Sequence, residues 1–398
     1  MVDERGRRAL LGSLAASCVV GLTGCLGDSN DEPAVIEPDV DTSHPDDGGA
    51  WPSFQYDAGN TGHAPGPGPT EAVERRWRFE TDDSVYSSPA VVEETVYVGS
   101  NDGGVYAIDA ENGDRRWRFG TNGAVSSSPA VADDTVYVGS EDGSVYAVDE
   151  GEERWHLETD DQVVSSPTVL EETVYVGSND ATLYALAADD GEMRWEFEAD
   201  GSLQRAPAVA DGVVYVGSDA GSLYAVDADD GEEVWRIETD DWIQSRPTVA
   251  DGVVYVGSND DHVYAVNVDD GEIHWTFETG GSVTSSPAVV DGVVYVGSFD
   301  NSLYALSAAS NGDPDDPAPE TQFWSVGGFL EVRSSPAVAD GTVYVGNEDG
   351  FVRALSPETG TERWQYQTED WVASSPAVVD GVVYVGSGDG SVYALEEP

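Results

Sequence analysis

Short runs in which apolar and polar residues alternate recur from residue 74 to the end of the chain. One set consists of "VTSSPAVV", "GVVYVGS" and "SLYALSA", and a Trp-centred run such as "IHWTFET" accompanies each set. Alternation with period two, rich in Val, Tyr and Trp, predicts β-strands, and the intervening "NDG", "EDG" and "GDG" are typical of hairpin turns. No stretch has helical periodicity. The pattern therefore predicts an all-β protein built from short strands.

The runs form eight repeats of about 40 residues. The repeat is marked by a Trp in the last strand and by the Pro of "SSPAV" near the first strand. The Trp residues are Trp77, Trp117, Trp155, Trp195, Trp235, Trp275, Trp324 and Trp364. One insertion, "SNGDPDDPAP" at 310–319, has the composition of a surface loop. Four strands per repeat at this period indicate a β-propeller, whereas a β-solenoid would have shorter coils and capped ends.

The two ends of the repeat region complete one another. The first element, "ERRWRFE" at 74–80, is a lone fourth strand, and the last, "SVYALEE" at 391–397, is a third strand with nothing after it. Pairing them leaves no open blade at either terminus. We therefore predict an eight-bladed β-propeller over 74–398, with four-stranded blades and the N-terminal strand completing the last blade.

The N-terminal region is typical of an export signal. Arg7 and Arg8 precede a 14-residue apolar run, "ALLGSLAASCVVGL", which resembles a Tat signal peptide and is too short to span a bilayer. It ends in "LTGC", which resembles a lipobox, so residues 1–24 are predicted to be removed and Cys25 lipidated. Residues 25–50 are acidic, Pro-rich and aperiodic, as expected of a disordered tether. Residues 51–73 then lead into the propeller.

Charge narrows the class of partner. The chain has 77 acidic residues against 17 basic ones, all of them Arg, which gives a formal charge of −60. This excess favours solubility and resembles proteins of salt-loving archaea, where salt screens the self-repulsion. Nucleic acid is not expected as a partner because no basic patch is evident. Contact with the membrane is expected only through the lipid anchor, at the outer face of the cytoplasmic membrane.

The junction between third and fourth strands carries a family resemblance. The runs "AIDAENGDRRW", "AVDADDGEEVW" and "ALSPETGTERW" resemble the signature of PQQ-like, or quinoprotein, propeller repeats, and "WPSFQYDAGNTG" at 51–62 is similar to the segment that precedes such propellers. The resemblance implies that each Trp packs between neighbouring blades. The family includes dehydrogenases that hold PQQ beside Ca²⁺ and also non-enzymatic, BamB-like scaffolds.

The chain is expected to belong to the non-enzymatic branch. It has only two Cys, both in the N-terminal region, and none of its five His residues is spaced to share a metal with another. We predict a non-catalytic binding or scaffold protein at the cell surface that needs no cofactor or metal. The alternatives are a PQQ- and calcium-dependent dehydrogenase and a lectin-like sugar-binding propeller.

Candidate binding residues come from positions that break the repeat. In antiparallel blades, the fourth-to-first connections and the second-to-third hairpins share one face, and variation concentrates there. The candidates are Tyr86, Gln204, Arg205, Trp242, Gln244, Arg246, Phe299, Arg333 and Trp371. First strands are innermost in propellers, so these side chains are expected near the mouth of the central channel. Converging Arg and Trp favour a protein or a small anion as ligand.

Two interpretations of these substitutions stay open. In "DDWIQSRPTVA" at 240–250, Trp242, Gln244 and Arg246 replace small residues and share one strand face by alternation. That face either points into the channel mouth or packs against the next blade, with Arg246 neutralising nearby acidic residues.

Overall fold

The computed structural model describes residues 50–309 and 322–398. The chain separates into two units, 1–41 and 42–398, and all the described residues belong to the second. The predicted export signal, the Cys25 lipidation site, residues 25–49 of the tether and the 310–319 insertion lie outside the described residues. None of the described residues forms a helix that could cross a membrane.

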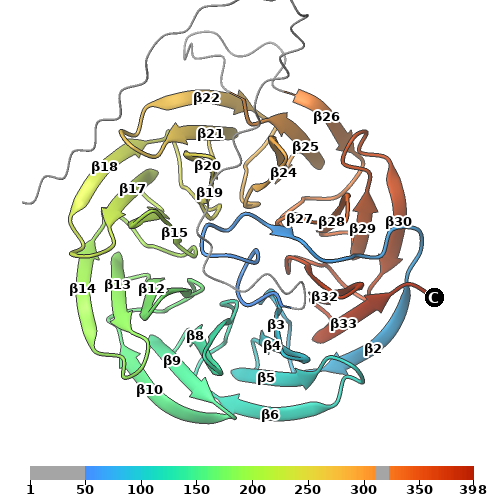
Figure 1. Ribbon diagram of the computed structural model, residues 1–398, viewed down its shortest axis with the longest axis horizontal. Coiled ribbons are helices and arrows are strands. Elements are labelled where there is room, and N and C mark those ends of the chain that lie inside the picture. Colours follow the sequence, from blue (N-terminus) through green and yellow to red (C-terminus); the bar gives the residue numbers. More distant parts are fainter. Residues whose placement is uncertain (1–49, 310–321) are drawn as a thin grey trace, which may run out of the picture. The chain divides into compact units, whose positions relative to one another are not determined.

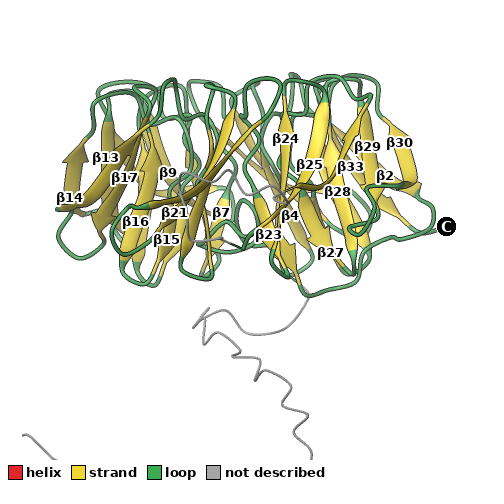
Figure 2. Cartoon of the chain, turned by 90° about the horizontal axis from the view of Figure 1, so that it is seen from above, coloured by secondary structure: helices red, strands yellow, loops and turns green. Residues whose placement is uncertain are grey.

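Eight blades surround a central channel, as Figure 1 shows, and Figure 2 shows the strands running between the two faces of the disc. Each blade has four antiparallel strands ordered from the channel outward. The first strands are β3 (Ala90–Val92), β7 (Ala130–Ala132), β11 (Thr168–Leu170), β15 (Ala208–Ala210), β19 (Thr248–Ala250), β23 (Ala288–Val290), β27 (Ala337–Ala339) and β31 (Ala377–Val379). The second strands are β4 (Thr95–Gly99), β8 (Thr135–Gly139), β12 (Thr173–Gly177), β16 (Val213–Gly217), β20 (Val253–Gly257), β24 (Val293–Ser298), β28 (Thr342–Gly346) and β32 (Val382–Gly386).

The outer half of each blade carries the longer strands. The third strands are β5 (Gly104–Asp109), β9 (Ser144–Asp149), β13 (Thr182–Ala187), β17 (Ser222–Asp227), β21 (His262–Asn267), β25 (Ser302–Ser307), β29 (Phe351–Leu355) and β33 (Ser391–Glu396). The fourth strands are β6 (Arg115–Gly120), β10 (Glu152–Glu158), β14 (Met193–Glu198), β18 (Glu233–Glu238), β22 (Ile273–Glu278), β26 (Gln322–Gly327), β30 (Glu362–Gln367) and β2 (Glu74–Glu80). Blades are numbered one to eight from β3–β6 onward.

The predicted closure of the ring is confirmed. In blade eight, β2 pairs antiparallel with β33, with Glu74 opposite Glu396 and Glu80 opposite Ser391. The two ends of the repeat region therefore share one sheet, and the ring closes through backbone hydrogen bonds. This confirms the eight-bladed all-β architecture.

The first strands are shorter than the sequence pattern predicts. In "VTSSPAVV" only Ala288–Val290 pairs as a strand, and the other first strands are equally short. Pro287 has no N–H to donate, and the neighbouring Ser side chains form their own hydrogen bonds: Ser285 Oγ accepts from the Gly297 amide at 3.1 Å. The Ser-Ser-Pro run therefore lies along the channel wall outside the sheet.

The repeated Trp residues join neighbouring blades. Trp77 in β2 of blade eight is buried, and its indole N–H donates to the Ala110 carbonyl of blade one at 2.9 Å. Its ring lies against Gly113 in the turn between β5 and β6, where an added Cβ would come within 2.9 Å of the indole. In blade seven, the Trp364 indole donates to Pro69 O at 2.7 Å. The N-terminal segment thus supplies the acceptor that a turn supplies elsewhere.

Residues 51–64 line the inner edges of the first strands. A first strand has only one neighbour, so its other edge presents unpaired N–H groups to the channel. Backbone carbonyls of this segment accept from six of these strands at 2.7–2.9 Å. The pairs are Val91 with Trp51, Val131 with Pro52, Val209 with Ala58, Val249 with Gly59, Val289 with Thr61, and Val338 with Gly62. Strand β1 (His63–Ala64) also pairs in parallel with β27. The segment closes the channel, as the blue trace in Figure 1 shows.

Side chains of the segment reinforce this closure. The Asn60 amide is buried and donates to the Pro247 carbonyl at 3.1 Å and to the Pro207 carbonyl at 3.4 Å. The Gln55 amide donates to Pro336 O at 3.2 Å. Side chains of this one segment are therefore tied to blades four, five and seven.

The Trp–Gly contact predicts the outcome of a matched pair of Gly substitutions. Gly113 and Gly212 have φ of 78° and 77°, but only Gly113 has a neighbour within 4 Å of an added Cβ. We expect Gly113→Ala to lower the free energy of unfolding by about 1–3 kcal/mol more than Gly212→Ala, because only the first overpacks the Trp77 contact. Chemical denaturation of both variants measures the difference, and equal losses would contradict the contact.

The segment contact predicts a pH-dependent loss of stability in Asn60→Asp. The new carboxylate would face two carbonyls and cannot donate when ionised, so we expect a loss of about 3 kcal/mol at neutral pH. Burial raises its folded pKa, so the loss is full above that pKa and shrinks as the pH falls toward about 4. Asn301→Asp is the control. Asn60 and Asn301 both have positive φ, at 57° and 71°, but Asn301 is exposed. Thermal melts across pH that leave both variants alike would refute the role of Asn60.

Candidate functional site

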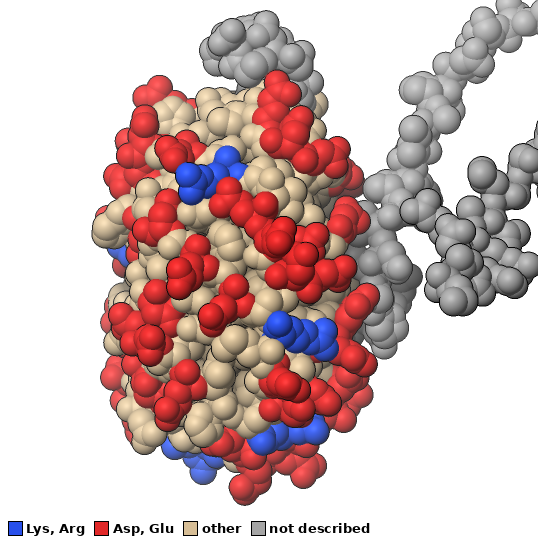
Figure 3. Space-filling view, turned by 90° about the vertical axis from the view of Figure 1, so that its left-hand side faces the viewer, with Lys and Arg blue, Asp and Glu red and all other residues tan. Residues whose placement is uncertain are grey.

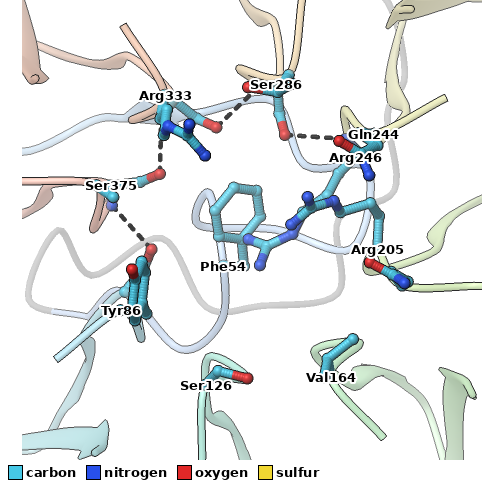
Figure 4. Close-up of a pocket in the computed structure, with 15 residues that line it drawn as sticks. Phe54, Tyr86, Ser126, Val164, Arg205, Gln244, Arg246, Ser286, Arg333 and Ser375 are labelled. Carbon is cyan, nitrogen blue, oxygen red and sulfur yellow. Dashed lines mark hydrogen bonds between the residues drawn. The ribbon is translucent and has the colours of Figure 1, made fainter. Parts of the chain in front are cut away.

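A pocket of about 290 Å³ occupies the central channel on the face that carries the fourth-to-first connections. Its wall consists of residues just before the first strands of all eight blades, and Phe54 from the N-terminal segment lies at its centre (Figure 4). Because residues 51–64 pair with the first strands further along the channel, the pocket is open at one end and blocked at the other. Its volume is at the lower end of the range of about 300–1,000 Å³ for small-molecule sites.

The structure brings six of the nine predicted binding residues to this pocket. They are Tyr86, Gln204, Arg205, Gln244, Arg246 and Arg333. The other three, Trp242, Phe299 and Trp371, are not among its lining residues. They belong to the loops of the same face, at the rim. The predicted residues therefore form an inner polar group and an outer aromatic group.

The stretch 240–250 runs from the rim into the pocket. Ile243 and Ser245 are fully buried in the blade, while the residues that alternate with them face the channel side. Trp242 has half of its surface exposed, Gln244 lines the pocket, and Arg246 lies deepest. Of the two open interpretations, the channel position fits these three side chains, and packing against the next blade does not.

A ring of serine hydroxyls links the blades around the pocket. The backbone N–H of the second Ser in one Ser-Ser-Pro run donates to the second Ser hydroxyl of the next blade, at 2.8–3.0 Å. This second Ser is replaced in two blades, by Ala206 and Arg246. Ala206 has no hydroxyl to accept from Ser166, and Arg246 has none to accept from Ala206. The ring is therefore interrupted between blades three and five.

Arg246 bridges this interruption with its side chain. Its guanidinium lies over the Phe54 ring, with the carbon 3.4 Å from the ring centroid, and donates to Ser166 Oγ of blade three at 3.0 Å. Arg205 replaces the first Ser of its run in blade four and extends beside Arg246 toward the centre of the channel (Figure 4). The small side chain of Ala206 leaves room for Arg246 to reach across blade four.

Burial dominates the electrostatics of both guanidinium groups. Removal from water lowers the pKa of Arg205, an effect that Asp219 opposes and Arg333 increases. Burial lowers the pKa of Arg246 well below its usual value, and the charge of Arg205 adds to this effect. Asp219 is itself partly buried, which raises its pKa against the influence of Arg205 and Gln244. The pocket thus holds two close positive charges with little compensation.

Arg333 differs from these two because it is already paired. Its Nε contacts Glu348 at 2.9 Å and its Nη2 contacts Glu331 at 3.1 Å, and its guanidinium lies 4.6 Å from the centroid of the Phe299 ring. The side chain is close to half exposed. Arg333 and Phe299 therefore form part of the rim wall, with the positive charge neutralised locally.

Aromatic side chains flank the mouth of the pocket on opposite sides of the ring. Tyr86 of blade one stacks against Trp371, which precedes blade eight, with ring centroids 4.3 Å apart. Trp371 also covers Gly388, where any Cβ would clash with the indole. Trp242 before blade five stands alone, with 49% of its surface exposed. Tyr86 and Trp242 are thus both about half exposed beside the cationic pocket, and Trp371 is partly buried.

Phe54 and the serine ring were not found from the sequence. Phe54 lies in a segment without a repeat counterpart, so no alignment indicated where it would be placed. The serine run was visible as a repeat, but its bonds between blades depend on the curvature of the ring. A signal for the site did exist, because Arg205, Ala206 and Arg246 are the departures from Ser in this run.

The pocket lacks the donors for the calcium–quinone pair of quinoprotein dehydrogenases. Its described lining contains Arg, Gln, Ser, Thr and Tyr but no carboxylate, His or Cys. Across the part of the chain that the structure describes, no three such side chains gather as a metal site. Ca²⁺ takes carboxylate and other oxygen ligands, so the lining does not fit a calcium-bound cofactor. We derive no chemical step through PQQ.

Solved structures share this fold at low identity. BamB from Moraxella catarrhalis is 20% identical with a TM-score of 0.70, covering 82% of this chain and 98% of that chain. Quinohemoprotein alcohol dehydrogenase from Comamonas testosteroni is 17% identical with a TM-score of 0.73, covering 88% and 81%. The computationally designed Ika8 protein is 18% identical with a TM-score of 0.68, covering 83% and 100%. An assembly factor, an enzyme and a designed protein match about equally well, so the likeness establishes the fold alone.

Comparison with curated protein sequences gave no significant match. A family model described as outer membrane protein assembly factor BamB matches residues 71–128, 105–206, 201–314 and 315–397, which together span the propeller. With the Trp-bearing repeats, the closed eight-bladed ring and this match throughout 71–397, the chain belongs to the BamB family of PQQ-like β-propeller proteins.

Proposed function

We propose that this protein is a non-catalytic binding protein that uses the pocket face to dock a protein partner at the cell surface. The observation that carries the proposal is the placement of two exposed aromatic rings, Tyr86 and Trp242, and the partly buried Trp371 around a blind, cationic pocket on that face. Trp and Tyr are frequent anchors of protein interfaces because they bury a large area at low entropic cost. Acidic side chains predominate on the side of the ring that Figure 3 shows.

The lining of the pocket supports binding over catalysis. General acid–base catalysis needs a group that accepts and releases protons near neutral pH, most often His or a carboxylate. The described lining itself offers guanidinium, amide and hydroxyl groups and no carboxylate or His. The carboxylates that contact it lie behind the wall, where Glu141 accepts from Ser126 and Glu348 pairs with Arg333. These groups suit the recognition of a ligand by hydrogen bonds and charge.

Export and lipid anchoring complete the proposal. Arg7, Arg8 and the lipobox-like "LTGC" that ends at Cys25 support a lipid-anchored position at the outer face of the cytoplasmic membrane. The family is named for an outer membrane protein assembly factor, which agrees with an exported protein that contacts other proteins. A single acyl chain binds membranes weakly, so stable attachment would need a second chain.

We expect loss of the rim aromatics to abolish partner capture. In quantitative cross-linking on native membranes, the double variant Trp242→Ala/Trp371→Ala should yield at least tenfold less cross-linked partner than the parent protein. Phe323→Ala is the matched control, because Phe323 is an equally exposed aromatic, at 58%, on the outer strand β26. If both variants capture the same partners in the same amounts, the rim is not a docking surface.

The dehydrogenase alternative predicts a spectroscopic result. We expect the purified protein, mixed with PQQ and Ca²⁺, to show no quinone-dependent reduction of a redox dye with alcohol substrates, because the described lining has no acidic ligand for the metal. A quinoprotein dehydrogenase assayed in parallel confirms that the assay works. Dye reduction that requires both PQQ and Ca²⁺ would overturn the non-catalytic proposal.

A further inference from the structure

Arg205 and Arg246 of the pocket are partly buried and have no carboxylate partner. Neither Arg205 nor Arg246 forms an ion pair within 50–309 or 322–398, although the chain has 77 acidic residues. Arg205 Nε is buried without any hydrogen-bond partner. In the described part of the chain, the guanidinium group of Arg246 contacts the Ser166 hydroxyl and the face of the Phe54 ring. A cation held largely out of water without a counter-charge is unfavourable unless something else supplies that charge.

The repeat shows that the fold does not require these arginines. At the position of Arg246, six blades have Ser, and at that of Arg205, seven have Ser. Those Ser residues make the bonds that hold the wall: the Ser245 hydroxyl accepts from Gly257 N at 2.6 Å, and Ser286 accepts from Arg246 N at 3.0 Å. Blades four and five lose such bonds where Arg stands instead. Arg246 replaces one lost bond by its contact with Ser166, but Arg205 Nε has no partner, so the Ser hydroxyls that the other blades keep are not fully replaced.

The shape and chemistry of the pocket define what would supply the charge. About 290 Å³ admits a small molecule, and the described lining places no negative side chain in its way. Two guanidinium groups lie on one side, the Phe54 ring lies at the centre, and the Tyr86 ring faces them from across the channel (Figure 4). Guanidinium groups bind planar carboxylates through paired N–H donors, and the aromatic rings offer an apolar surface to the rest of the ligand.

We propose that the central pocket binds a small organic carboxylate, with the carboxylate held by Arg205 and Arg246 and its apolar body between Phe54 and Tyr86. The site lies inside the channel and shares Tyr86 with the aromatic rim proposed to dock a protein, but its carboxylate is held by residues that are not part of that rim. It therefore does not depend on that proposal, and each can fail without the other. Gln204, Gln244 and the serine hydroxyls complete a neutral polar wall around the ligand.

Calorimetric titration of the full chain in detergent tests this with benzoate as the probe. Benzamide has the same shape without the charge, and inorganic phosphate has charge without the apolar body. At constant ionic strength we expect benzoate to bind at least tenfold more tightly than either. Arg246→Ser and Arg205→Ser should each weaken benzoate binding at least tenfold. Arg236→Ser removes the same charge from the outer strand β18 and should leave it unchanged.

The thermal stability of the same variants separates a ligand site from a structural role. Arg246→Ser supplies a hydroxyl that can accept the hydrogen bond that the ring lacks, and it removes an unpaired, partly buried charge. Ligand-free Arg246→Ser is therefore expected to melt at a Tm equal to or a few degrees above that of the parent protein. Equal affinity for benzoate and benzamide, tighter binding of phosphate, unchanged affinity in both pocket variants, or a lower Tm for Arg246→Ser would each overturn the proposal.

Discussion

The unpaired inner edge of the first strands is the constraint on which the site depends. Every blade must expose such an edge because its first strand has no further neighbour toward the axis. The segment 51–64 satisfies these edges with its own carbonyls on six of the eight blades. In doing so it turns an open channel into a pocket with one mouth. Phe54 is placed at the centre of that pocket by the same pairing.

Comparison of the Ser-Ser-Pro run between blades shows where the ring departs from its repeat. Seven blades keep the Ser that accepts from a Gly amide of the second strand, and six keep the Ser that faces the next blade. The departures, Arg205, Ala206 and Arg246, all lie in blades four and five. They act together: the Ala leaves space, one Arg crosses it, and the second Arg extends beside the first. Three departures that share one space give this part of the ring a local chemistry that the other blades lack.

Most of the fold could be predicted from the sequence because hairpin turns and Trp spacing act locally. The period of the repeat gave eight blades, and the unmatched strands at 74–80 and 391–397 gave the closure. The face of the site followed from the antiparallel order of strands. The depth of each side chain did not follow, since Trp242 and Arg246 are equivalent by alternation but lie at the rim and near the floor. Phe54 could not be placed because its segment follows the channel axis and obeys no repeat.

A crystal structure of the protein soaked with 4-bromobenzoate tests most directly whether the central pocket is a carboxylate site. The anomalous signal of bromine locates the ring, and the electron density places the carboxylate. We predict one strong bromine peak inside the channel between Phe54 and Tyr86, with the carboxylate oxygens within hydrogen-bond distance of the Arg205 and Arg246 guanidinium groups. A channel without bromine, while sites elsewhere on the surface are occupied, would contradict the assignment of this pocket as a carboxylate site.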